Sequence, residues 1–154
     1  PKLGWLRSAT WAKPAIILMS LWGGSGGTML IFLAGLKEIP QSLLEAAMID
    51  GANAWQRFWR VTIPLLTPTI FFNLVLGVIS SFSVFAVAYV ATQGGPARAT
   101  YFYVYHLYNT AFVDYSMGYA SALAWVFFLI LLFFTAVQFR LQRLWVYYEA
   151  DERK

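Results

Sequence analysis

The sequence predicts an all-α protein, a polytopic bundle of transmembrane helices. Of its 154 residues, 60% are hydrophobic, 19% aromatic and only 12% charged, which is far more apolar than a soluble domain of this size. A globular core of this length leaves much of its surface in solvent and cannot hide so many apolar side chains. The apolar runs also lack the alternation of barrel strands, so helices are expected to satisfy the backbone within lipid.

Three uncharged stretches are long enough to cross the bilayer. They cover residues 14–36, 69–92 and 118–139. A hydrocarbon core of about 30 Å needs about 20 helical residues, and each stretch exceeds that length. We therefore expect one membrane domain over residues 1–154, with a polar segment at about 37–66 and a loop at about 93–117 between its three spans.

The basic residues predict the orientation of the spans. Seven of them lie in the 37–66 segment and after residue 139, namely Lys37, Arg57, Arg60, Arg140, Arg143, Arg153 and Lys154. Four lie before the first span and in the 93–117 loop, namely Lys2, Arg7, Lys13 and Arg98. Because cytoplasmic segments carry the excess of positive charge, we expect the 37–66 segment and the C-terminus in the cytoplasm and the 93–117 loop outside.

Composition excludes several classes of function. The chain has no cysteine, so disulfides, thiolate nucleophiles and cysteine-based metal sites are not expected. The net charge of +4 is scattered over short polar segments, which fits membrane orientation and not nucleic-acid binding. The opening PKLGWLRS has neither Met nor a charged leader before an apolar run, so we expect no signal peptide and interpret the chain as a fragment.

The middle of the first span contains the glycine-rich stretch GGSGG, residues 23–27. Each glycine weakens a helix by about 1 kcal/mol relative to alanine. One interpretation is an unwound segment that lines a substrate path, since irregular backbone at membrane depth persists only beside protein or water. The alternative is that the small residues let neighbouring helices pack closely.

Polar side chains mark one face of the second span. Asn73, Ser80 and Ser83 are separated by 7 and 3 residues, which places them near one another on a helix, and Ser81 adjoins them. Such a stripe is compatible with a substrate pathway. The alternative is that the hydroxyls bond to their own helix backbone, as serines within bundles commonly do.

The loop between the last two spans combines turn residues with aromatic residues. TQGGPARAT has turn chemistry, and YFYVYHLYNTAF after it is too short to cross a membrane, so we expect an interfacial or re-entrant helix. His106 is the single histidine, so no histidine metal cluster and no Ser-His-Asp arrangement is predicted. We interpret His106 as an interfacial packing residue and Asp114 as a solvated acid.

The segment after the first span predicts a short docking helix. Ser42 and Glu45 have capping-box spacing, and Gly51 suits the left-handed residue just past a helix end. Between them an apolar face is expected from Leu43, Leu44, Ala47 and Met48. A helix of about two turns is marginal alone, so a partner groove should receive it, although an ordinary loop with one stabilising turn is the alternative. A second amphipathic piece containing Trp55, Phe58, Trp59 and Thr62 then leads through Pro64 back to the bilayer as an elbow along the membrane surface.

GLKEIPQSLLEAAMIDGANAWQRFWRVTIPLLTP resembles the EAA loop of binding-protein-dependent ABC importer permeases. The fixed positions present are Glu45, Ala46, Ala47, Asp50, Gly51, Ala52, Phe58, Pro64, Leu65 and Pro68. YVATQGGPARAT and YNTAFVDYSMGYASALAWVFFLI are similar to the carbohydrate branch, in particular to the maltose-transporter-like inner-membrane subunit. The resemblance covers nearly the whole chain and implies the type I permease core in a prokaryotic cell (inner) membrane, with the three spans corresponding to the C-terminal half.

The resemblance also implies the partners. The EAA helix of such permeases docks into a cytoplasmic ABC ATPase dimer, which assigns ATPase coupling to Leu43, Leu44, Glu45, Ala46, Ala47, Met48, Asp50 and Gly51, with Glu45 facing a basic residue. A second permease subunit and an extracytoplasmic solute-binding protein complete the expected complex, surrounded by membrane lipid and without nucleic acid. The chain is expected to be non-catalytic and to bind no cofactor or metal, because ATP and Mg belong to the ATPase.

Substrate contacts are implied at Gly24 in the first span and Ser81 in the second. Phe85 and Ala88 stand where the maltose subunit has asparagines, so we expect Phe85 and Tyr89 to line the substrate pathway by aromatic stacking. The predicted function is import of a sugar or related carbohydrate. The alternatives are a membrane-embedded enzyme, against which the spans offer no Asp, Glu, His, Lys or Arg, and a truncated scaffold that does not transport.

Overall fold

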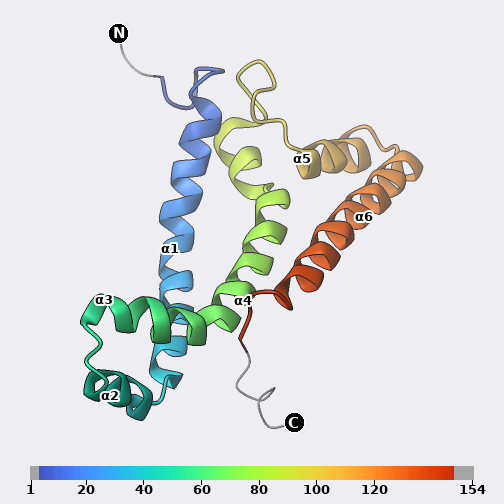
Figure 1. Cartoon of the computed structure of the whole chain (residues 1–154). Coiled ribbons are helices and arrows are strands. Elements are labelled where there is room, and N and C mark those ends of the chain that lie inside the picture. Colours follow the sequence, from blue (N-terminus) through green and yellow to red (C-terminus); the bar gives the residue numbers. More distant parts are fainter. Residues whose placement is uncertain (1–3, 148–154) are drawn as a thin grey trace. The chain divides into compact units, whose positions relative to one another are not determined.

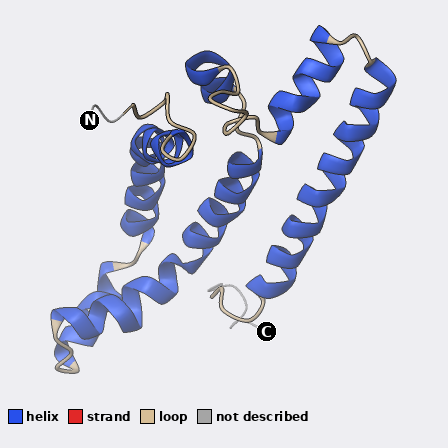
Figure 2. Cartoon of the chain, turned by 90° about the horizontal axis from the view of Figure 1, so that it is seen from above, coloured by secondary structure: helices blue, strands red, loops and turns tan. Residues whose placement is uncertain are grey.

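The computed structural model describes residues 4–147, which form helices joined by short loops (Figure 1, Figure 2). In chain order the elements are α1 (Ala12–Glu38), α2 (Gln41–Ile49), α3 (Ala54–Arg57), the π-helix η1 (Phe58–Thr62), α4 (Ile63–Phe82), the π-helix η2 (Ala88–Thr92), α5 (Tyr103–Tyr108), the π-helix η3 (Asn109–Val113) and α6 (Met117–Gln142). No strand occurs among these described residues. Three helical stretches are long and apolar enough to cross a membrane, at Ala12–Glu38, Ala54–Phe82 and Met117–Gln142, which confirms the predicted all-α polytopic class.

The chain divides into two compact units. The first unit comprises Pro1–Gly24 and Gly77–Ala136, and the second comprises Ser25–Leu76 and Val137–Lys154. The divisions fall inside α1, α4 and α6, so each of these helices contributes to both units.

Helix α1 passes through the glycine-rich stretch without interruption. The interpretation of residues 23–27 as an unwound segment is therefore wrong. A Cβ added at Gly23, Gly24, Gly26 or Gly27 would meet no atom within 4 Å, so no other part of the described chain packs against these glycines either. The apolar residues on both sides hold the helix, because a backbone within lipid has no alternative partner for its polar groups.

The second spanning helix begins earlier than its apolar stretch. It runs from α3 through η1 into α4, and Pro68 lies inside it. Proline has no N–H to donate to the carbonyl of Pro64 four residues before it. The Thr67 hydroxyl donates to that carbonyl instead, at 2.6 Å, so the helix continues past the proline.

The same helix also ends earlier than predicted. Residues 69–92 were expected to form one span, but α4 stops at Phe82 and a short irregular stretch separates it from the helical turn before η2. The Ser80 and Ser81 hydroxyls both donate to the Gly77 carbonyl, at 3.1 and 2.7 Å, and the Ser83 hydroxyl donates to the Ile79 carbonyl at 2.9 Å. Serines that back-bond to helix carbonyls compete with the helical ladder, and here two lie in the last turn of α4 and the third directly follows it.

Phe71 organises the packing in the second unit. Its ring meets Phe139 at 5.3 Å and Trp145 at 6.1 Å between centroids, both edge to face, and only 6% of Phe71 is exposed. The buried Thr67 accepts a hydrogen bond from the backbone N–H of Tyr147 at 2.9 Å. These contacts fix the end of α6 and the residues after it to the first half of α4.

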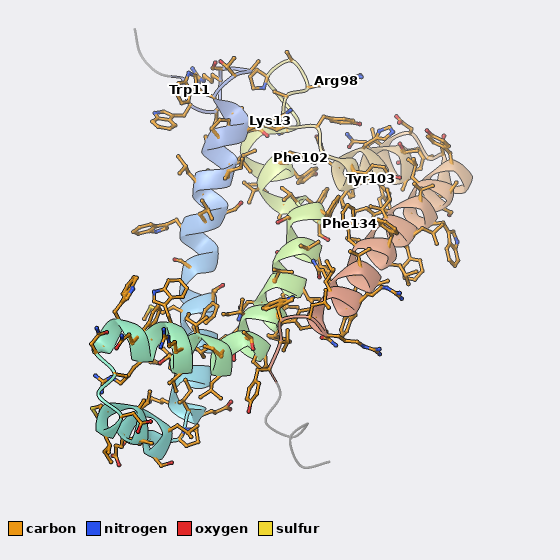
Figure 3. The ribbon with its side chains drawn as sticks, in the orientation of Figure 1. Trp11, Lys13, Arg98, Phe102, Tyr103 and Phe134 are labelled. Atoms are coloured by element: carbon orange, nitrogen blue, oxygen red, sulfur yellow. The ribbon has the colours of Figure 1, made fainter. Side chains whose placement is uncertain are left out.

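In the first unit, α5 lies against α6. The Tyr103 hydroxyl donates to the Leu123 carbonyl at 2.8 Å, and the Tyr103 ring stacks on Phe127 at 5.5 Å. Phe134 on α6 lies toward α4 and meets Phe82 at 5.3 Å (Figure 3). Aromatic side chains thus join the elements of this unit, although most of the surface of α6 is exposed.

Candidate functional sites: a docking helix and an aromatic cluster

The C-terminal end of α2 is fixed by a Schellman motif. Gly51 has φ +81°, the Gly51 N–H donates to the Met48 carbonyl at 3.0 Å, and the Ala52 N–H donates to the Ala47 carbonyl at 3.0 Å. This is the paired bonding that ends a helix at a left-handed residue, and glycine adopts that backbone without a steric cost. The prediction for Gly51 is confirmed.

The N-terminal end of α2 differs from the prediction. Pro40 is the N-cap residue, and no side chain caps the helix, so the expected Ser42–Glu45 capping box does not form. The helix begins directly after Pro40, which places Ser42 within the first turn and not before it. A complete capping box occurs instead at α3, where Asn53 Oδ1 accepts from the Gln56 N–H at 2.8 Å and Gln56 Oε1 accepts from the Asn53 N–H at 2.9 Å. The N-x-x-Q spacing is the sequence signal for it.

The apolar residues of α2 are divided between two directions. Leu44 and Ala47 are half-buried against the chain's own residues. Leu43 and Met48 are 41% and 49% exposed, and Ile49 is 87% exposed. Ile49 was not among the predicted docking residues, and its spacing of six residues from Leu43 does not place the two on one helix face. Half of the predicted apolar face therefore holds α2 in place, while Leu43, Met48 and Ile49 remain available to a partner.

A cavity of about 490 Å³ separates α2 from α3 and η1 in the second unit. Its lining is Gln41, Leu44, Glu45, Met48, Ala54, Arg57, Phe58 and Thr62. Glu45 and Asp50 are exposed, and neither forms an ion pair with a basic side chain among residues 4–147. The Glu45 carboxylate is thus accessible to a cation from outside the chain.

An aromatic group marks the elbow after α2. The rings of Trp55, Phe58 and Trp59 lie within 5.5–6.3 Å of one another and are 69%, 42% and 51% exposed. Figure 1 shows α2 and α3 next to each other in this part of the chain. Exposed tryptophans at the start of a spanning helix are typical of a membrane–water interface, in agreement with the expected elbow.

The first unit contains an aromatic cluster of six rings. Its members are Phe85, Tyr89, Tyr101, Tyr105, Tyr108 and Phe112. Phe85 stacks on Tyr89 at 5.4 Å, and both contact Tyr108, at 5.0 and 5.4 Å. Tyr105 contacts Phe85, Tyr89 and Tyr101, while Phe112 extends the cluster from Tyr108 at 5.2 Å. The structure therefore joins Phe85 and Tyr89 and adds four rings that the sequence did not assign to a site.

The polar groups of the cluster interact mainly with one another. Tyr89 raises the pKa of Tyr108 above its ordinary value of 10.0, first through a side-chain hydrogen bond and then through charge interaction. The Tyr101 hydroxyl accepts from Asn109 at 3.1 Å and lies 3.4 Å from Nδ1 of the half-buried His106. At the outer end the Arg98 guanidinium lies 5.6 Å from the Tyr101 ring centroid, on the loop labelled in Figure 3.

The other predicted pathway residues stand apart from the cluster. The Ser81 hydroxyl bonds to its own helix, as the alternative interpretation expected. Gly24 borders open space, because an added Cβ would meet no atom within 4 Å. Hydrogen bonds of the Thr100 hydroxyl stabilise the TQGGP loop. This hydroxyl lies 2.6 Å from the Thr92 hydroxyl and donates to the Gly95 carbonyl at 2.8 Å. Among the described residues no group of three His, Asp or Glu side chains is placed to hold a metal.

Comparison with known proteins decides the family. Residues 3–146 match the family described as binding-protein-dependent transport system inner membrane component. The chain belongs to this family. As a member of the inner-membrane transport family with three apolar spanning helices, it is a multi-pass membrane protein.

Relatives within the family support the same classification. The chain is 48% identical over 153 residues to the probable ABC transporter permease protein YesP of Bacillus subtilis, covering 98% of this chain and 49% of the relative. It is 41% identical to the sn-glycerol-3-phosphate transport system permease protein UgpA of Brucella abortus, covering 89% and 47%. It is 39% identical to the sulfoquinovosyl glycerol transport system permease protein SmoG of Agrobacterium fabrum, covering 90% and 45%. The chain thus spans about half the length of these family members.

Proposed function

We propose that this chain forms part of the permease of a binding-protein-dependent importer that moves a sugar or a related carbohydrate into the cell. The observation that carries the proposal is α2, a nine-residue helix with a fixed C-terminal end and exposed Leu43, Met48 and Ile49. So short a helix is marginal in water, and its exposed apolar side chains are suited to a partner groove. Relatives named for transport of glycerol 3-phosphate and sulfoquinovosyl glycerol support a carbohydrate-derived solute.

The partner proposed for α2 is a dimer of cytoplasmic ABC ATPase subunits, which bind ATP and Mg. The exposed Glu45 carboxylate offers a charge to a basic residue in the ATPase groove. Closure of the ATPase dimer moves this groove, and the helices attached to α2 then alternate between outward and inward openings, as the repeats of transporters do. A second permease subunit and an extracytoplasmic solute-binding protein complete the proposed complex, in which this chain performs no chemistry.

The substitution Glu45→Lys tests the coupling. Loss of one member of a buried charge pair typically costs about 2–5 kcal/mol, so we expect the variant to bind the ATPase at least about thirtyfold more weakly. In proteoliposomes, transport-coupled ATP hydrolysis should be lost while membrane insertion stays normal. Glu38→Lys makes the same charge reversal at the end of α1 and should keep the parental rate. Parental transport by Glu45→Lys would refute the coupling role.

Copurification separates this proposal from the non-transporting scaffold. We expect the intact complex to retain an ATPase subunit in mild detergent, and its ATP hydrolysis to rise when the loaded solute-binding protein is added. A scaffold would show neither stimulation nor uptake.

A further inference from the structure

The elbow formed by α3 and η1, residues 54–62, presents two different faces. Trp55 and Trp59 are 69% and 51% exposed and border neither of the two cavities between α2 and the elbow. The second of these cavities, of about 400 Å³, lies between the end of α2 and a face of the elbow that includes Arg57 and Arg60. The elbow is therefore amphipathic, with its tryptophans directed away from α2 and its arginines on the polar side.

The two arginines of the elbow have no partner in the described part of the chain. Arg57 is half-buried and Arg60 is exposed, and neither side chain makes a hydrogen bond or an ion pair among residues 4–147. Asp50 borders the same cavity as both arginines, whereas Glu45 borders the other cavity together with Arg57 and not with Arg60. Arg60 thus carries the positive charge of the elbow that the chain's own acids balance least.

Tryptophans beside arginines match the headgroup region of a bilayer. A tryptophan ring combines an apolar body with a polar N–H and gathers where hydrocarbon meets water. Neighbouring side chains on a helix are about 100° apart, so the long side chain of Arg60 can reach the phosphate level while Trp59 remains at the edge of the hydrocarbon. The guanidinium is a planar fork of donors that fits two oxygens of a phosphate.

The charge of the elbow indicates which lipid it fits. The basic residues of the chain predict that this segment lies in the cytoplasm, and the cytoplasmic leaflet is the one whose anionic lipids attract basic segments near the membrane. An acidic surface of the ATPase would also attract Arg60. A water-soluble surface gives no use to the exposed Trp55 and Trp59 at the start of a spanning helix, whereas a lipid headgroup accounts for the arginines and the tryptophans together.

We propose that the elbow binds an anionic phospholipid through its headgroup phosphate, with Arg60 as the main contact and Arg57 as a second cation. Trp55 and Trp59 set the depth of the elbow in the interface. The bound lipid anchors the start of the second spanning helix next to α2. This inference goes beyond the proposed import function and does not require it, because lipid binding is measured without transport.

Headgroup contact is measured in the complete transporter, placed in nanodiscs of phosphatidylcholine that also contain phosphatidylglycerol. The chain has no cysteine, so Ala54→Cys, at the exposed first residue of α3, gives the single thiol of this subunit once cysteines of the other subunits have been replaced. A fluorophore on this thiol is quenched by spin-labelled phosphatidylglycerol or by spin-labelled phosphatidylcholine in separate samples. One basic side chain near a membrane surface corresponds to about a fivefold preference for anionic lipid, so we expect phosphatidylglycerol to associate at least about fivefold more strongly.

Three substitutions assign the preference to Arg60. Arg60→Gln should lower it about fivefold, and Arg60→Lys, which keeps the charge, should stay within about twofold of the parental value. Both replace an exposed side chain that has no partner among the described residues, so the fold should be retained. Arg98→Gln removes an exposed charge from the loop between the last two spans and, as the matched control, should leave the preference at position 54 unchanged.

A titration with inorganic phosphate distinguishes a lipid from a free anion. Sodium chloride at equal ionic strength is the reference, because salt of any kind screens an exposed charge. We expect phosphate and chloride to weaken the preference for phosphatidylglycerol equally. Phosphate that abolishes the preference where chloride does not would show a site for a soluble anion, and would overturn the lipid assignment.

The remaining outcomes separate this proposal from the import function. Equal quenching by the two lipids in the parental complex overturns the headgroup site. A preference that persists in Arg60→Gln while retention of the ATPase weakens also overturns it, and assigns Arg60 to the ATPase contact. Neither result bears on uptake, and a complex that transports no solute but keeps the Arg60-dependent lipid preference would defeat the import function alone.

Discussion

Gly51 offers a quantitative test of the docking helix. Its φ of +81° lies in the left-handed region, and an added Cβ would meet no atom within 4 Å, so a substitution there changes only the backbone energy. Alanine in this conformation costs about 1–2 kcal/mol, and a β-branched residue costs more, whereas asparagine tolerates the region. We therefore expect Gly51→Asn to cost least, followed by Gly51→Ala and then Gly51→Val.

Two assays measure this order. Hydrogen exchange at the Gly51 and Ala52 amides reports opening of the Schellman bonds, and 1.4 kcal/mol corresponds to about tenfold faster exchange where opening and closing are fast relative to exchange. ATPase binding should weaken in the same order, because α2 must keep its end geometry to present Leu43, Met48 and Ile49. Equal exchange and equal ATPase binding in Gly51→Asn and Gly51→Val would refute the argument that this helix end positions the docking surface.

Two further predictions concern the second unit. Thr67→Val should destabilise the chain by about 1–3 kcal/mol in detergent unfolding, because the Pro64 carbonyl loses its donor and the Tyr147 N–H loses its acceptor, whereas Thr67→Ser should be close to parental. A parental melting temperature for Thr67→Val would contradict this assignment. Gly35→Ala should lower the melting temperature, because the new Cβ would lie 2.6 Å from Thr69 Oγ1, whereas Gly27→Ala should raise it through a gain in helix propensity of up to about 1 kcal/mol. The same sign of change in both variants would show that local contacts do not decide the effect.

The spans were predictable because long uncharged runs have few alternatives in a bilayer. Residues 14–36 and 118–139 lie within α1 and α6, whose ends extend a few residues beyond the apolar runs. The second span was less accessible to sequence reasoning. Hydropathy identifies the apolar run at 69–92. It does not show that serine hydroxyls at the end of α4 bond to helix carbonyls, or that the Thr67 hydroxyl bonds to the carbonyl that Pro68 leaves without a donor.

Local signals predicted one end of α2 and missed the other. A glycine after an apolar helical repeat indicated the left-handed end at Gly51, because that preference is a property of a single residue. The capping box predicted at Ser42 and Glu45 requires Ser42 to be the N-cap residue. Pro40 takes that position, so the box does not form. The same spacing rule holds at Asn53 and Gln56, where both bonds form. The coupling roles of α2 and the pathway roles of Gly24 and Ser81 stay predictions.

The aromatic cluster shows the limit of sequence reasoning most clearly. Phe85 and Tyr89 are four residues apart, so helical spacing alone brings them near each other, and resemblance placed them on a pathway. Tyr105 and Tyr108 lie about twenty residues later, and no local pattern relates them to Phe85. Their contacts arise because the TQGGP loop returns the chain, and Thr100 fixes that loop through Thr92 and Gly95.

The sequence by itself determined the membrane class, the helical architecture and the short amphipathic helix, because apolar length and helical period depend only on residues near one another in the chain. Tertiary structure decided which apolar side chains of α2 stay exposed, where the second span breaks, and which rings gather around Tyr108. These features depend on contacts between segments distant in sequence, and each contact contributes its free energy only once the chain has folded.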